Sequence, residues 1–126
     1  MFRRIRSSFA WVRMLSRFRK GDIRGAAEEA ARFRATGLTR PMFEALDATI
    51  DLLSHRPGEA KAKFESVLIS LTNKSESRDR YIYLYSLYYS RLLSGKSDAD
   101  EARKEAWLLA TPKLIRILPL PPEPVE

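Results

Sequence analysis

The sequence predicts an all-α domain of six helices in three antiparallel helix-turn-helix pairs. Apolar residues recur every three or four positions along most of the chain, which is the period of a helix with one buried face. Two similar stretches, 21–33 and 58–68, place Ala26 and Ala60 34 positions apart. A fixed period of this size is typical of stacked helical pairs, none of which can bury its apolar face alone. Such arrays bind other molecules more often than they transform them.

The chain is long enough for one domain and has the composition of a folded protein. Its 126 residues are 44% hydrophobic and 31% charged, which is typical of a globular domain rather than a disordered chain. A domain of this size buries about two-thirds of its unfolded surface. The absence of cysteine excludes disulfides and thiolate metal sites. No apolar run approaches the roughly 20 residues that a membrane-spanning helix needs.

The net charge of +7 is concentrated at the start of the chain. Residues 1–20 contain no acidic residue and seven basic ones, and the basic and acidic residues of the remainder cancel. The chain is therefore a neutral helical body with a basic N-terminal segment. The pI of about 10.0 therefore does not indicate that the whole surface is basic or that it binds nucleic acid.

Local signals set the boundaries of the first four helices. Asp22 follows a helix predicted over 2–18 and can cap the next helix, because its carboxylate can accept a backbone N–H. Gly37 is a candidate C-cap, and Pro41 and Pro57 suit the first turns of the third and fourth helices. Within one domain over residues 1–112, the three pairs are expected at about 5–36, 41–72 and 78–111.

The second half of the chain is expected to contain a central helix and an extended end. The helix predicted over about 78–94 is apolar on more than one side, which is typical of a helix surrounded by others. A sixth helix is predicted to begin at Ser97-Asp98 and to end before Pro112. Because five of the seven prolines lie in the last fifteen residues, residues 113–126 are expected to form an extended polyproline II tail.

Residues 11–18, 43–50 and, more loosely, 85–92 each begin with an aromatic residue and have a large residue three positions later. Residues 60–64 read Ala-x-x-x-Phe. These patterns resemble the tetratricopeptide repeat family, whose paired helices carry Trp-x-x-Leu-Gly-x-x-Tyr and Ala-x-x-x-Phe. The resemblance implies a right-handed array in which the first helix of each pair lines a concave groove. The family's small residue is replaced by Leu15, Asp47 and Tyr89 here, so a generic six-helix array or bundle is the alternative.

Five tyrosines lie between residues 81 and 89, and they cannot all point inward from one helix. Most of them are expected to pack in the core. The resemblance implies that this helix lines the groove, so Tyr83 or Tyr88, together with Arg80 and Arg91, is predicted to hold an extended peptide. Tyrosine and arginine contribute strongly to binding at protein interfaces.

The basic N-terminal helix has three interpretations. It packs as the first helix of the array, or it lies on an anionic membrane, or it contacts nucleic-acid phosphates. An arginine- and serine-rich start also resembles a mitochondrial presequence. The arginines that would act in the membrane or nucleic-acid interpretation are Arg3, Arg4, Arg6, Arg13 and Arg17.

No pattern in the sequence predicts catalysis. His55, the only histidine, follows a helix end, where a positive charge is ordinarily favourable. Glu44, Asp47 and Asp51 share one helical face, which is expected to be a solvated acidic stripe rather than a metal site, and which would favour basic peptides if it lined a groove. No phosphate-binding loop or zinc spacing is present. We therefore expect no enzyme, no cofactor and no metal.

The leading prediction is a non-enzymatic adaptor that binds a peptide or a partner helix in a helical-repeat groove. The alternative is a peripheral binder of anionic membranes or nucleic acid. A homo-oligomer or a subunit of a larger complex is also compatible with three repeat units. The adaptor is expected in the cytoplasm, and the alternative function would place the chain at a membrane surface. The presequence-like start leaves import into mitochondria open. The spacing Arg116-x-x-Pro119-x-x-Pro122 matches ligands of SH3-type grooves, but proline-rich tails often match it by chance, and a plain disordered end is the favoured interpretation.

Overall fold

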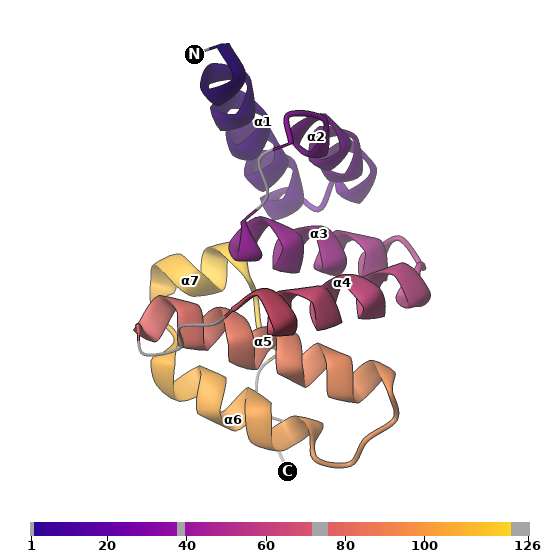
Figure 1. The fold of residues 1–126 in the computed structure, drawn as a ribbon, viewed down its shortest axis with the longest axis vertical. Helices are drawn as coiled ribbons and strands as arrows, with labels where there is room; N and C mark the ends of the chain where they lie inside the picture. The colour runs from indigo at the N-terminus through magenta and orange to yellow at the C-terminus, as the bar shows by residue number, and fades with distance from the viewer. Residues whose placement is uncertain (1, 38–39, 72–75, 122–126) are drawn as a thin grey trace.

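The computed structural model describes residues 2–37, 40–71 and 76–121, and side chains from residue 11 onward. The described residues form seven α-helices and no strand (Figure 1), which confirms the predicted all-α class. The helices are α1 Phe2–Arg19, α2 Ile23–Ala35, α3 Pro41–Leu53, α4 Pro57–Ser70, α5 Ser77–Leu93, α6 Ala99–Leu109 and α7 Pro112–Ile117.

The first six helices pack as three consecutive pairs. Helix α1 packs on α2, α3 on α4, and α5 on α6, while α2–α3 and α4–α5 contacts join neighbouring pairs. Helix α5 also contacts α3, so it has neighbours on three sides. Its apolar surface on more than one side is explained by this position.

The predicted local signals lie where helices begin and end. The Asp22 side chain accepts a hydrogen bond from the Gly25 amide at 3.0 Å, as an N-cap. Pro41 and Pro57 occupy the first turns of α3 and α4. Gly37 follows α2 with a φ of 74°, a conformation that glycine adopts without strain. These features depend on a few adjacent residues, which is why the sequence predicts them.

The predicted count of six helices is wrong for the described residues. A seventh helix, α7, forms where an extended tail was expected, and the Thr111 hydroxyl caps it by accepting a hydrogen bond from the Leu114 amide at 3.2 Å. Pro112 lies in its first turn, where a missing N–H is tolerated. Residues 118–121 follow in non-helical conformation, and residues 122–126 of the predicted tail lie outside the described residues.

The α1–α2 pair lies at one end of the stack (Figure 1). Met14 is fully buried, and Trp11 and Phe18 are half-buried against the core. The Phe33 and Phe43 rings, 4.2 Å apart between centroids, join α2 to α3. The described part of the basic N-terminal helix is therefore packed in the array, as the first of its three interpretations expects.

Candidate functional site

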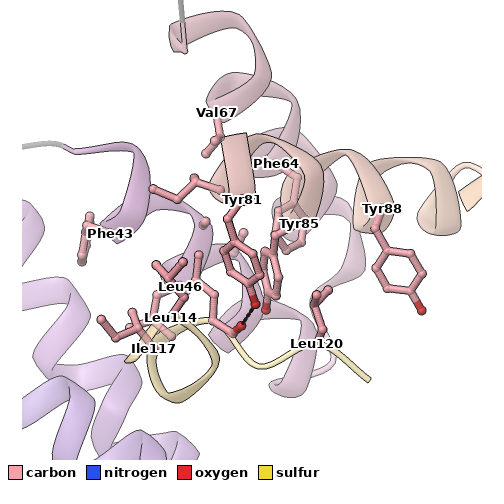
Figure 2. Packing of buried hydrophobic residues seen from close by; sticks show 14 of the residues in the cluster. Phe43, Leu46, Phe64, Val67, Tyr81, Tyr85, Tyr88, Leu114, Ile117 and Leu120 are labelled. Carbon is pink, nitrogen blue, oxygen red and sulfur yellow. Dashed lines mark hydrogen bonds between the residues drawn. The ribbon is translucent and has the colours of Figure 1, made fainter. Parts of the chain in front are cut away.

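The C-terminal segment, defined here as residues 112–121, lies against the face formed by α3 and α5. Figure 1 shows α7 beside these two helices, and Figure 2 shows the segment crossing below the tyrosines of α5. Four aliphatic side chains of the segment are each less than a tenth exposed. They are Leu114, Ile117, Leu118 and Leu120. Figure 2 shows Leu114 of the segment next to Leu46 of α3.

Two aromatic side chains hold the backbone of this segment. The Tyr81 hydroxyl donates to the Leu118 carbonyl at 2.6 Å, and the Trp107 indole N–H donates to the Pro121 carbonyl at 3.0 Å. Neither carbonyl belongs to a sheet, and both accept side-chain donors from the helical body. Contacts of this kind recognise an extended backbone whatever side chains it carries, while apolar pockets select the side chains.

The floor of the face is fixed by a buried polar contact between α3 and α5. The Tyr85 and Thr49 hydroxyl oxygens lie 2.7 Å apart, and the Thr49 hydroxyl lies 2.9 Å from the Ala45 carbonyl, which it can reach only as a donor. The two hydroxyls therefore share a hydrogen bond that joins α5 to α3. Burial raises the pKa values of Tyr81 and Tyr85 above the ordinary value of 10, so both hydroxyls keep their protons at neutral pH.

The apolar stripes of both helices continue beyond the C-terminal segment. On α5, residues 81, 85, 88 and 92 share one side of the helix, and Leu92 is 49% exposed. On α3, Leu46 and Ile50 are buried, whereas Leu53 at the end of the same stripe is also 49% exposed. The two helices run in the same direction in Figure 1, so each stripe ends in an exposed leucine at the corresponding end of its helix.

The four side chains predicted to hold a peptide do not gather into one open groove. Tyr88 is buried, and Tyr83, five positions away, is half-buried on a different side of the helix. Arg91 lies 3.6 Å from the Asp98 carboxylate at the start of α6. Arg80 likewise lies 3.6 Å from a carboxylate of α6, that of Glu105. Both arginines thus lie along the α5–α6 contact, and whether any of the four binds a partner stays a prediction.

Sequence reasoning missed the two side chains that hold the C-terminal segment. Of the five tyrosines of α5, only Tyr83 or Tyr88 was predicted to bind a peptide, and no role was predicted for Trp107. A half-buried indole generally finds an acceptor for its N–H, which is the one signal that could have drawn attention to Trp107. The acceptor itself, the Pro121 carbonyl, could not be anticipated because the segment was expected to extend away from the domain.

The expected solvated acidic stripe on α3 is wrong. Asp47 and Asp51 are 3% exposed, and the Lys63 ammonium of α4 lies 3.0 Å from the first and 2.5 Å from the second. Arg34 donates two hydrogen bonds to Asp47, at 2.6 and 2.7 Å, and Arg56 lies 2.9 Å from Asp51. Basic residues from α2 and α4, and from the turn that precedes α4, therefore enclose these carboxylates.

A cavity of about 240 Å³ lies beside this charged network. It is lined by Arg34, Phe43, Glu44, Asp47, Ala62, Lys63 and Ser66. The two cations on its wall are already engaged by Asp47, so their charge is compensated. Among the described residues, no group of three potential metal ligands comes together.

The residues of the alternative basic site are only partly described. Arg17 lies 3.0 Å from the Asp22 carboxylate and 3.8 Å from the buried Glu29 carboxylate, so its charge is compensated within the fold. Arg13 is exposed, and the side chains of Arg3, Arg4 and Arg6 lie outside the described residues. None of the described helices is long and apolar enough to cross a membrane.

Two sequence candidates remain, His55 and the spacing that matches SH3 ligands. His55 is exposed after the end of α3 and has a φ of 62°. In the spacing that matches SH3 ligands, Arg116 is exposed, Pro119 is half-buried between two buried leucines, and Pro122 lies outside the described residues. Comparison with protein-family models, with curated proteins and with solved structures found no match.

Proposed function

We propose that this chain is a non-enzymatic protein-interaction module, a tetratricopeptide-like array whose α3–α5 face binds an extended segment of a partner protein. The observation that carries the proposal is the chain's own C-terminal segment on this face, with the Leu118 and Pro121 carbonyls bound by Tyr81 and Trp107. An extended backbone with aliphatic side chains is the kind of ligand that these donors and the apolar stripes accommodate.

Two further features support a partner on this face. Leu53 and Leu92 continue its stripes as half-exposed leucines, and burial of large apolar side chains is the main driving force of association. The α3 and α5 surfaces are also held in fixed register by the Tyr85–Thr49 contact. A preformed surface loses little conformational freedom on binding.

The alternative proposal is binding of anionic membranes or nucleic acid by the arginines of α1. Its support is the acid-free sequence of residues 1–20. The ion pairs of Arg17 and the burial of Met14 favour the first proposal, because they use the C-terminal half of α1 for internal packing. Salt separates the two, since charge-led binding weakens as ionic strength rises whereas apolar binding persists.

The proposal is tested by site-specific photo-crosslinking in extract of the native cell. A photoreactive residue replaces Leu92 on the proposed face, and the control replaces Ile69, which is 82% exposed on α4. We expect a discrete cross-linked protein from position 92, present at low and high salt, and none of that size from position 69. Equal products from the two positions, or a product lost at high salt, would contradict the proposal.

A further inference from the structure

The C-terminal segment contributes four side chains to the buried core, but it is held there differently from the six paired helices. Helix α7 has only six residues, too few for a stable helix by itself, and it is not among the helices that pack closely through their backbones. The segment is attached through aliphatic side chains and through the two hydrogen bonds to Leu118 and Pro121. Because no described helix follows it, the segment can leave without breaking the pairs α1–α2, α3–α4 or α5–α6.

The segment also specifies the chemistry of what the face holds. Its buried side chains are all aliphatic, at positions 114, 117, 118 and 120. Pro119 lies between two of them, and a proline in this place prevents the helix from continuing and keeps the backbone extended at little entropic cost. The charged residues Lys113 and Arg116 are exposed. A matching ligand is thus a short helical turn followed by an extended Leu-Pro-Leu sequence.

We propose that residues 112–121 are an intramolecular ligand, which occupies the partner-binding face until a partner segment of the same aliphatic, proline-containing type displaces it. The proposal rests on the function proposed above. Leu53 and Leu92 lie at the ends of the two apolar stripes, where the C-terminal segment does not cover them. A partner can therefore bind these exposed leucines first. Binding therefore exchanges one aliphatic segment for another on the same donors, Tyr81 and Trp107.

The test measures binding of a fluorescent peptide with the sequence of residues 111–126 to full-length chains by anisotropy. In the variant Leu118→Ala/Leu120→Ala, the internal segment loses two buried side chains and should leave the face more often. The matched control is Leu108→Ala, since Leu108 is 86% exposed. Apparent affinity rises with the fraction of molecules whose site is free, so we expect the double variant to bind the peptide at least about 10-fold more tightly than wild type and the control to equal wild type.

A change on the other side of the contact tests the geometry. Adding Tyr81→Phe to the double variant removes the donor to the Leu118 carbonyl of the peptide and should weaken its binding about 5-fold or more. A peptide with the same residues in scrambled order should not bind.

Equal peptide affinity for wild type and the double variant would show that the segment does not block the face, and would overturn this inference while leaving the proposed function intact. No binding by a double variant that remains helical and unfolds cooperatively would overturn it too, and cross-linking from position 92 would then decide the proposed function separately.

Hydrogen exchange of the wild-type chain keeps the inference testable if the double variant fails to fold. The Leu118 amide, which donates to the Leu114 carbonyl at 2.8 Å, should exchange by local opening faster than the amides of α3 and α5. Exchange of that amide only with global unfolding would identify the segment as part of the core and overturn the inference.

Discussion

Replacing Lys63 with methionine tests the charged network between α2, α3 and α4. The Lys63 ammonium lies 3.0 Å from Asp47 and 2.5 Å from Asp51, and both carboxylates are 3% exposed. Removing one partner of a fully buried ion pair costs about 3–5 kcal/mol. Each carboxylate keeps one arginine, Arg34 or Arg56, and the Lys63 side chain is 30% exposed. We therefore expect a smaller loss, about 2 kcal/mol, from the free energy of unfolding.

The measurement is urea denaturation followed by circular dichroism, with the midpoint and slope fitted for each chain. Lys61→Met is the matched control on the same helix, because the Lys61 ammonium lies 3.9 Å from Glu65 and both side chains are about half exposed. An exposed pair of this kind contributes at most about 0.5 kcal/mol. Equal small losses for the two variants would contradict this prediction, since they would show that solvent screens Asp47 and Asp51 despite their burial.

Three further predictions concern local conformation and pH. Gly25→Ala should destabilise the chain by about 1 kcal/mol or more, because the Cβ of the new alanine would meet the Asp22 carboxylate that caps α2. Gly58→Ala is the control in the same urea assay: nothing lies near the new Cβ, so the chain should be stabilised by about 0.5 kcal/mol. His55→Gly should raise the free energy of unfolding by about 0.5–1 kcal/mol, because a φ of 62° strains any residue that has a Cβ. A lower thermal midpoint for this variant would contradict the prediction. Burial raises the pKa of Tyr81 and raises that of Tyr89 to about 12, so the folded state keeps protons that the unfolded state releases near pH 10. The contribution of these tyrosines to stability should be constant below pH 10 and should then fall by about 1.4 kcal/mol per pH unit for each tyrosine, until the pH reaches the folded-state pKa. Urea midpoints that do not change from pH 9 to 11 would contradict this.

The helices and their ends could be predicted from the sequence because they depend on neighbouring residues. The Asp22 cap, the glycine after α2 and the prolines at the start of α3 and α4 are all signals within a few positions. The pairing of consecutive helices could be expected from the short connections between them, because helices joined by a short turn pack against each other. The tetratricopeptide resemblance added the expectation of a groove, which stays a prediction.

The errors concern contacts between residues far apart in the chain. Asp47 has the pattern of a surface acid, and it is buried because Arg34 and Lys63 arrive from other helices. Helix α7 was missed because prolines dominate its neighbourhood, whereas the burial of Leu118 against α5 depends on tertiary contact 37 positions away, from Tyr81. The periodicity of apolar residues shows which residues share one side of a helix, but it does not show which other helix that side contacts.

Competition tests whether the α3–α5 face binds a partner segment of the same type as the chain's own C-terminal segment. The chain with a photoreactive residue at position 92 is irradiated in extract of the native cell at high salt, with increasing unlabelled peptide of residues 111–126 or its scrambled counterpart. We expect the native peptide, and not the scrambled one, progressively to suppress the cross-linked partner, because peptide and partner compete for the same face and for the donors Tyr81 and Trp107. A partner captured at an undiminished level at saturating native peptide would contradict it.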